Sequence, residues 1–206
     1  MATSISGTAG VTFPAGGVGN PAGTVVGTTD TQTLTNKTLS TGLVMGVSAI
    51  TSGTAVASTS GTSIDFTSIP SWVKRITVMF SSMSTSGTSN YLIQIGSGSI
   101  TATGYLSGSG YVSTSVNNTT TGTTGTTGFV MYNGSAANAL HGACILMNVS
   151  GNIWDSTHTI GSTSGINGIM SGSGVLTLGG ALDRVRITTV NGTDTFDAGS
   201  INILYE

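Results

Sequence analysis

The sequence predicts an all-β protein, a jelly-roll-like C-terminal β-sandwich preceded by an extended N-terminal arm or stem. From about Ala49 onward hydrophobic residues recur with a period of two, and no segment shows a sustained helical period. The 32 glycines and the Ser/Thr runs cut these stretches into short strands and turns. Charged residues make up 6% of the chain, where a soluble domain carries roughly a quarter, so we expect ion pairs to contribute little to the fold.

Two regions follow from the change in pattern. Residues 1–47 contain Gly, Ala, Thr and Ser with scattered Val and Leu, and they lack enough apolar residues for a core. We expect an attachment or stem segment that is either flexible or becomes ordered around sister chains or on a larger assembly. Its Val and Leu content favours docking. Residues 48–206 are expected to form the β-sandwich domain.

About nine or ten short strands are expected in this domain. Ile76, Val78 and Phe80 share one face of a half-buried strand, and Tyr91, Ile93 and Ile95 share one face of another. The remaining strands are expected at 63–66, 103–106, 128–132, 140–149, 153–160, 175–178, 184–189 and 200–205.

Connections between strands are marked by glycine and asparagine. The pair Asn191-Gly192 predicts a type I′ hairpin that joins the strand ending near Thr189 to Phe196, because this turn needs positive φ at both central residues. The polar stretch from Val112 to Thr127 predicts a long exposed loop or an edge hairpin. A second loop is expected from Gly161 to Gly174.

Charge and hydropathy exclude several kinds of partner. The chain has five Lys and Arg residues and a net charge of −2, too few cations for the basic patch of a nucleic-acid-binding protein or for polybasic membrane attachment. No stretch approaches the roughly 20 apolar residues of a membrane span. The first residues lack the basic and apolar regions of a signal peptide. We therefore expect no nucleic-acid partner, no membrane insertion and no export by the usual signal.

The ionisable residues do not form a catalytic pattern. Two histidines, one cysteine and seven acids show no recognisable constellation of base, nucleophile or metal ligands. We predict that the protein is not an enzyme and has no catalytic residue, cofactor or metal. His141 and His158 are assigned packing or surface roles, although three copies of one histidine on a trimer axis could hold a metal or an anion. Cys144, in an apolar run, is expected to be an inert buried thiol.

Four further side chains are assigned structural roles. Asp194 and Asp197 flank Phe196 and are expected to stabilise a turn rather than to form the carboxylate pair of a glycosidase. Trp72 and Trp154 adjoin apolar residues and are both expected in the core.

A motif in the stem resembles a segment of tail-fibre, collar and related surface proteins of tailed bacteriophages. It consists of Thr31, Gln32, Thr33, Leu34, Thr35, Asn36, Lys37, Thr38 and Leu39, preceded by Gly27-Thr28-Thr29-Asp30. The second half resembles a C-terminal domain of such proteins through the runs 71–78, 182–189 and 196–202. The resemblance covers about three-quarters of the 206 residues.

The resemblance implies a virion structural protein on the surface of the phage particle. It implies a homotrimer whose N-terminal segment attaches to other virion proteins of the tail, the portal or adaptor, or the capsid. Because the predicted stem is short, we consider both a short fibre for host attachment and a capsid decoration, cement or head-fibre protein without receptor binding. If the domain contacts a host-surface glycan, the candidate residues are Tyr105, Tyr111, Asn117 and Asn118. The alternative is that the tyrosines pack within ordinary strands and the asparagines lie in an exposed loop without a ligand.

Overall fold

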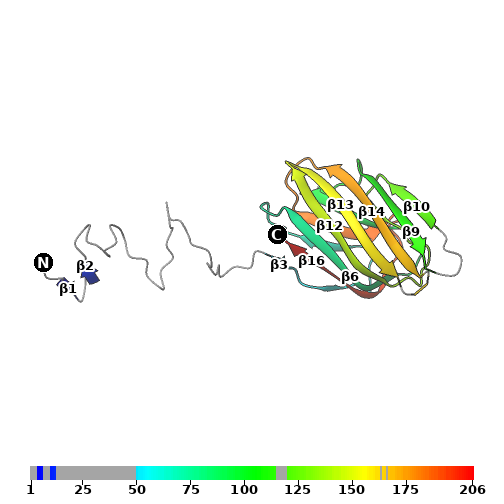
Figure 1. Cartoon of the computed structure of the whole chain (residues 1–206), viewed down its shortest axis with the longest axis horizontal. Coiled ribbons are helices and arrows are strands. Elements are labelled where there is room, and N and C mark those ends of the chain that lie inside the picture. Colours follow the sequence, from blue (N-terminus) through cyan, green and yellow to red (C-terminus); the bar gives the residue numbers. More distant parts are fainter. Residues whose placement is uncertain (1–3, 7–9, 13–49, 115–119, 163, 166) are drawn as a thin grey trace. The chain divides into compact units, whose positions relative to one another are not determined.

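The structure, a computed structural model, describes residues 4–6, 10–12, 50–114, 120–162, 164–165 and 167–206 (Figure 1). The chain divides into two compact units, Met1–Gly46 and Val47–Glu206. In the first unit, β1 (Ser4–Ser6) and β2 (Gly10–Thr12) form a hairpin. The rest of the predicted stem, including the motif from Thr31 to Leu39, lies outside the described residues, so its attachment role stays a prediction.

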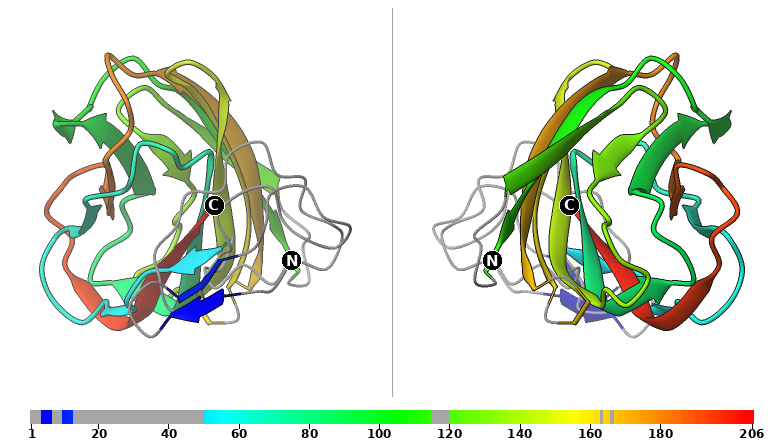
Figure 2. Two further views of the ribbon diagram at one scale, coloured as in Figure 1. Left: turned by 90° about the vertical axis from the view of Figure 1, so that its left-hand side faces the viewer. Right: turned by 90° about the vertical axis from the view of Figure 1, so that its right-hand side faces the viewer.

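The second unit is all-β, and its described residues form two antiparallel sheets and no helix. The large sheet has the strand order β10-β9-β14-β13-β12-β6-β16-β3, with β4 also paired to β16. The small sheet has the order β11-β7-β15-β5, with β8 paired to β7. The strands are β3 (Thr51–Ser52), β4 (Val56–Ala57), β5 (Ile64–Thr67), β6 (Arg75–Thr85), β7 (Tyr91–Ser97), β8 (Ser99–Ile100), β9 (Leu106–Ser113), β10 (Thr120–Gly125), β11 (Phe129–Met131), β12 (Leu140–Ser150), β13 (Ile153–Ser162), β14 (Gly168–Thr177), β15 (Arg184–Thr189) and β16 (Phe196–Tyr205). The views along the long axis in Figure 2 show the sheets as two layers, which confirms the predicted two-sheet architecture.

The core lies between the inner faces of the two sheets. On β6, Ile76, Val78 and Phe80 alternate with more exposed residues and are buried, as their spacing predicts. They belong to the same apolar cluster as Ile93 of β7 and Ile187 of β15, both fully buried. Burying one such aliphatic side chain stabilises the fold by about 1.5–3 kcal/mol, so this cluster is the main source of stability.

Strand β7 is buried on both faces, whereas its sequence predicted a half-buried strand. Every residue from Tyr91 to Gly96 is buried. On the outer face, Leu92 and Gln94 are covered by the segment before β11: the Cα of Gly128 is so close that an added Cβ would lie 3.1 Å from Leu92 and 3.2 Å from Gln94. The prediction failed because this covering segment is held beside β7 by the pairing of β11 with β7, and β11 is distant from β7 in the sequence.

The predicted hairpin at Asn191-Gly192 is wrong. Strand β15 belongs to the small sheet and β16 to the large sheet, so this turn carries the chain from one layer to the other. Of the two turn residues only Gly192 has a positive φ, +67°, and the turn is not of type I′. The Asn191 side chain instead organises the connection, accepting hydrogen bonds from the N–H groups of Thr193 and Asp194.

The two predicted long loops have different outcomes. The stretch from Val112 to Thr127 contains the end of β9 and all of β10, which pair antiparallel at the edge of the large sheet, as in the second of the two predicted alternatives. The loop predicted from 161 to 174 is largely strand, because β13 continues to Ser162 and β14 begins at Gly168. The glycines of β14 permit close packing: a Cβ on Gly168 would lie 2.5 Å from the Tyr111 ring.

Serine side chains of the large sheet join it to the free edge of the small sheet. Ser107 Oγ accepts a hydrogen bond from the N–H of Val130 (3.2 Å), and Ser109 Oγ accepts one from the N–H of Tyr132 (3.3 Å). The Ser109 hydroxyl also lies 3.0 Å from Nε2 of the buried His158. These contacts satisfy backbone groups at the edge of β11 and close the sandwich on this side.

Candidate functional site

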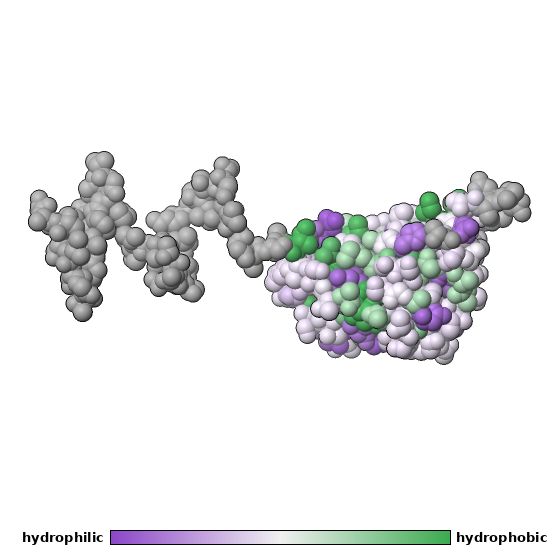
Figure 3. Space-filling view, turned by 90° about the horizontal axis from the view of Figure 1, so that it is seen from below, coloured by the Kyte–Doolittle hydropathy of each residue, from purple (hydrophilic) through white to green (hydrophobic). Residues whose placement is uncertain are grey.

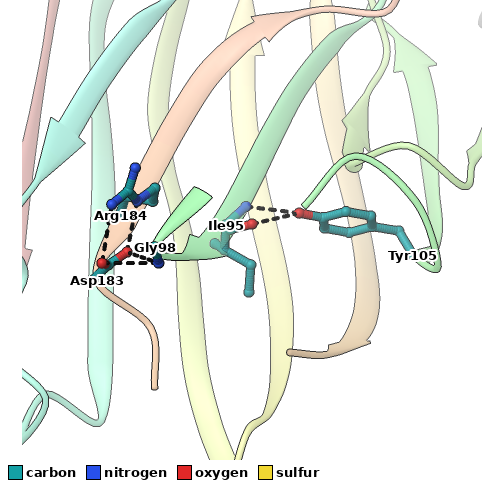
Figure 4. Close-up of polar contacts among 5 residues, drawn as sticks. All are labelled: Ile95, Gly98, Tyr105, Asp183 and Arg184. Atoms are coloured by element: carbon teal, nitrogen blue, oxygen red, sulfur yellow. Dashed lines mark hydrogen bonds and ion pairs between the residues drawn. The ribbon is translucent and has the colours of Figure 1, made fainter. Parts of the chain in front are cut away.

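Tyr105, proposed from the sequence as a surface contact, is a core residue. Its side chain is fully buried, and its ring meets Phe129 edge-on with the centroids 4.9 Å apart. The hydroxyl accepts a hydrogen bond from the Ile95 N–H at 2.8 Å (Figure 4). It donates to the Thr101 carbonyl at 2.9 Å. Burial raises the pKa of Tyr105 to about 12. The hydroxyl supplies hydrogen bonds to backbone groups of β7 and the following loop, so Tyr105 cannot serve as a surface platform.

Tyr111, also predicted as a candidate surface contact, is buried as well. It is 3% exposed, stacks on Tyr132 with centroids 5.3 Å apart, and donates its hydroxyl hydrogen to the Asn167 carbonyl at 2.9 Å. The other two predicted contacts, Asn117 and Asn118, lie outside the described residues, so their role stays a prediction. The sequence could not separate surface from core tyrosines because aromatic residues favour strands in either position.

The two tryptophans differ from each other. Trp154 is buried, as predicted, but Trp72 is 55% exposed. Trp72 lies in the turn closed by the hydrogen bond from the Val73 N–H to the Pro70 carbonyl, and Val73 rather than Trp72 enters the core. The Trp72 ring lies beside the ring of Tyr205, with the centroids 6.0 Å apart and the planes inclined by 50°.

The cysteine and one of the two histidines are buried, and the other histidine is exposed. Cys144 is free and buried, as predicted, and burial raises the pKa of its thiol to about 12, which keeps it protonated and unreactive. His158 lies opposite Cys144 on the next strand and is also buried, whereas His141 is exposed. Within the described part of the chain, no three side chains of His, Cys, Asp and Glu come together as a metal site.

Two acids stabilise chain connections, in agreement with their predicted role. Asp194 accepts hydrogen bonds from the Ser89 N–H at 3.0 Å and from the Asn191 amide. Asp197 accepts a hydrogen bond from the Ser84 hydroxyl. Both carboxylates are used by local partners near the end of β6 and the start of β16.

A row of polar side chains crosses the outer face of the small sheet. Asp65, Arg186 and Gln94 are direct neighbours on β5, β15 and β7. Arg186 donates from Nε and Nη2 to the two Asp65 oxygens at 2.7 and 2.8 Å, and Gln94 Nε2 donates to the Thr127 carbonyl at 2.8 Å. The side chains are therefore held in fixed orientations on a rigid sheet.

Gln94 and Arg186 of this row line a surface depression of about 340 Å³, which we call the Gln94 depression. Its lining includes Leu92, Gln94, Ala102, Thr127, Arg186 and Thr188. Gln94 is 8% exposed and Leu92 is 2% exposed, so these two residues form a floor that is nearly closed to solvent. The site can hold a small polar ligand by hydrogen bonds to side chains that are already in place.

A second ion pair on the same sheet has a structural role outside this depression. Asp183 accepts hydrogen bonds from Arg184 Nε at 2.7 Å and from the Gly98 N–H at 3.0 Å, which fixes the turn between β7 and β8 (Figure 4). The hydrogen bond from Arg184 lowers the pKa of Asp183. Gly98 has φ of +71°, a conformation that favours glycine at this turn.

Another depression lies on the large sheet. It has a volume of about 390 Å³ and is lined by His141, Thr114, Asn167 and Ile169 together with backbone of β13 and β14. These four side chains are exposed, and Ile169 is 51% exposed. The buried Ser162, 3% exposed, also belongs to its lining.

The rest of the surface has few charges. In Figure 3, most residues of the visible face are pale, with only scattered strongly hydrophilic or hydrophobic residues. The described part of the chain holds three ion pairs, Arg75–Glu206, Arg184–Asp183 and Arg186–Asp65. No helix in the described residues has the length and hydropathy of a membrane span.

Comparisons of the chain with protein-family models, with curated proteins and with solved structures gave no match. The function is therefore inferred from the chemistry of the residues. The sequence did not identify Gln94 and Arg186 as a pair because 92 residues separate them (186 − 94), and only the pairing of β7 with β15 brings them together.

Proposed function

We propose that this chain is a structural protein of a tailed-bacteriophage virion, a short trimeric surface fibre. Its N-terminal segment would anchor it to other virion proteins, and the β-sandwich would contact the host surface. The geometry that supports this proposal is the placement of the first and last strands of the described domain. Strand β3, at its start, pairs with β16, at its end, through Thr51 and Tyr205. The described part of the domain therefore begins and ends on neighbouring strands at one edge of the large sheet.

Surface chemistry supports a role outside the cell. A surface of Ser, Thr, Asn and Gly with few charges changes little with salt or pH, because screening and titration act on charged groups. The proposal assigns no catalytic step to the domain. In the described residues Cys144 and His158 are the only cysteine and histidine that face each other, and both are buried.

Location on the particle is the first prediction. In immunogold electron microscopy of intact virions, an antibody raised against residues 50–206 is expected to label the particle surface, with gold at the tail. Gold over the head would instead support the alternative, a capsid decoration or head-fibre protein that stabilises the shell. A particle without label, under conditions that label the purified protein, would contradict both assignments.

Trimer formation is the second prediction. The sequence of residues 1–47 contains too few apolar residues for a core of its own, and three copies together could bury their Val and Leu side chains. Multi-angle light scattering of the full chain at micromolar concentration is expected to give three times the chain mass of 20.4 kDa. A variant that begins at Ile50 is the control, and its measured mass is expected to correspond to fewer than three truncated chains. A full chain that stays monomeric would contradict the proposed fibre.

A further inference from the structure

The Gln94 depression combines a hydrogen-bond acceptor and a donor that have no other partner among the described residues. Because the Thr127 carbonyl can only accept, the Gln94 amide must turn its Nε2 toward it, which leaves Oε1 as an unused acceptor. Asp65 takes Nε and Nη2 of Arg186, which leaves Nη1 as an unused donor. Gln94 and Arg186 are direct cross-strand neighbours, so their side chains leave the sheet from adjacent positions on the same face.

Both groups are held in place before any ligand arrives. Gln94 is 8% exposed, and its side chain is confined by Gly128, whose Cα leaves only 3.2 Å between an added Cβ and Gln94 Cγ. Arg186 is fixed by its two-point contact with Asp65. Fixed polar groups lose little conformational entropy on binding, which favours recognition of a small ligand by a few contacts.

The charge of the depression is balanced. The positive charge of Arg186 is paired with Asp65 at 2.7 Å, and no other charged residue belongs to the lining. An anionic ligand would have to approach the Asp65 carboxylate together with the guanidinium, so a neutral ligand fits better. Exposed Ala102 and Val190 add an apolar wall beside these polar groups.

From this arrangement we propose that the Gln94 depression binds a neutral saccharide. Two adjacent sugar hydroxyls can donate to Gln94 Oε1 and accept from Arg186 Nη1, because each hydroxyl is both donor and acceptor. The C–H face of the sugar ring can pack against Ala102 and Val190. Placing this sugar on a bacterial surface rests on the proposed function, in which several copies would add their weak contacts.

The test is a titration of the full ¹⁵N-labelled chain with D-glucose, D-galactose, D-mannose, N-acetyl-D-glucosamine and L-rhamnose. For at least one sugar we expect saturable shifts of the Gln94 side-chain N–H₂ and the Arg186 Nε–H resonances. Gln94→Met, which removes the acceptor, and Arg186→Lys, which keeps the charge but removes Nη1, are each expected to weaken binding at least about tenfold. Arg184→Lys is the matched control, an arginine paired with Asp183 on the same face outside the depression, and should bind as the original protein does.

The spectra of the variants also show whether each one folds. If either Gln94→Met or Arg186→Lys is misfolded, the affinity of the other variant tests the proposal. The proposal is overturned if none of the five sugars gives saturable shifts. It is also overturned if both folded variants bind like the original chain, or if the shifts map to His141 and Asn167 on the large sheet. Virion labelling tests location alone, so a labelled virion whose protein binds no sugar contradicts only the saccharide site.

Discussion

Lowering the pH from 7 to 4 is expected to remove about 3 kcal/mol of the domain's stability through His158 alone. Burial lowers the pKa of His158 from 6.5 to about 4, and no neighbouring carboxylate contributes to the shift. The unfolded chain therefore binds a proton near pH 6.5 that the folded domain takes up only near pH 4. Each unit of difference corresponds to about 1.4 kcal/mol, so this contribution is complete above pH 6.5 and is lost as the pH falls to 4.

The surroundings of His158 explain why protonation is unfavourable. Ser109 Oγ lies 3.0 Å from Nε2, and Nδ1 has no hydrogen-bond partner. Cys144 faces it from β12 and Gly172 from β14, and neither can compensate a positive charge. Ser156, two residues earlier on the same face, has an unpaired hydroxyl of its own. A charged imidazole at this place would lie in the core without a counterion.

Urea denaturation at pH 7, 6, 5 and 4 measures the effect. The original chain is expected to lose stability over this range, and His158→Gln is expected to flatten the pH dependence by about 3 kcal/mol because glutamine does not titrate. His141→Gln replaces an exposed histidine and is the control, with a pH dependence close to that of the original. If His158→Gln does not fold, the chemical shift of the His158 Hε1 resonance is followed against pH in the original chain instead. A titration midpoint near pH 6.5 in the folded domain would contradict the prediction.

The sequence predicted the elements that depend on local pattern. The alternation in β6 places Ile76, Val78 and Phe80 in the core, because a strand with a period of two buries one face. The all-β class follows from the same pattern. Cys144 was correctly expected in the core because it stands in an apolar run.

The predictions that failed depend on contacts between distant segments. The Asn191-Gly192 pair marks a turn, but its sequence does not say whether the next strand joins the same sheet or the facing one. Tyr105 and Tyr111 are of the residue type expected at a glycan-binding surface. Both are buried, and their hydroxyls bind backbone groups of Ile95 and Asn167, which are not their sequence neighbours. The Gln94 depression was missed for this reason, since its polar groups come from β7, β15 and loops that are distant in the sequence.

Replacing Gly172 by alanine is expected to destabilise the domain by about 3 kcal/mol, the upper part of the range for overpacked sites. A Cβ at this position would lie 2.2 Å from the Gly108 carbonyl oxygen and 2.5 Å from His158 Cε1. The backbone oxygen belongs to the neighbouring strand β9, which is hydrogen-bonded to β14 and cannot withdraw alone. Gly172 thus allows β9 and His158 to approach the same point of β14.

Gly179→Ala is the matched control, because an added Cβ meets no atom within 4 Å. Its effect on the denaturation midpoint should stay within about 0.5 kcal/mol. The double variant Gly172→Ala with His158→Ala separates the two contacts. If the Gly108 carbonyl dominates, the coupling between the two substitutions is small, whereas relief of the imidazole contact would restore part of the stability. A Gly172→Ala variant as stable as Gly179→Ala would show that β9 and β14 can separate, and would contradict the close packing on which the Ser109–His158 contact depends.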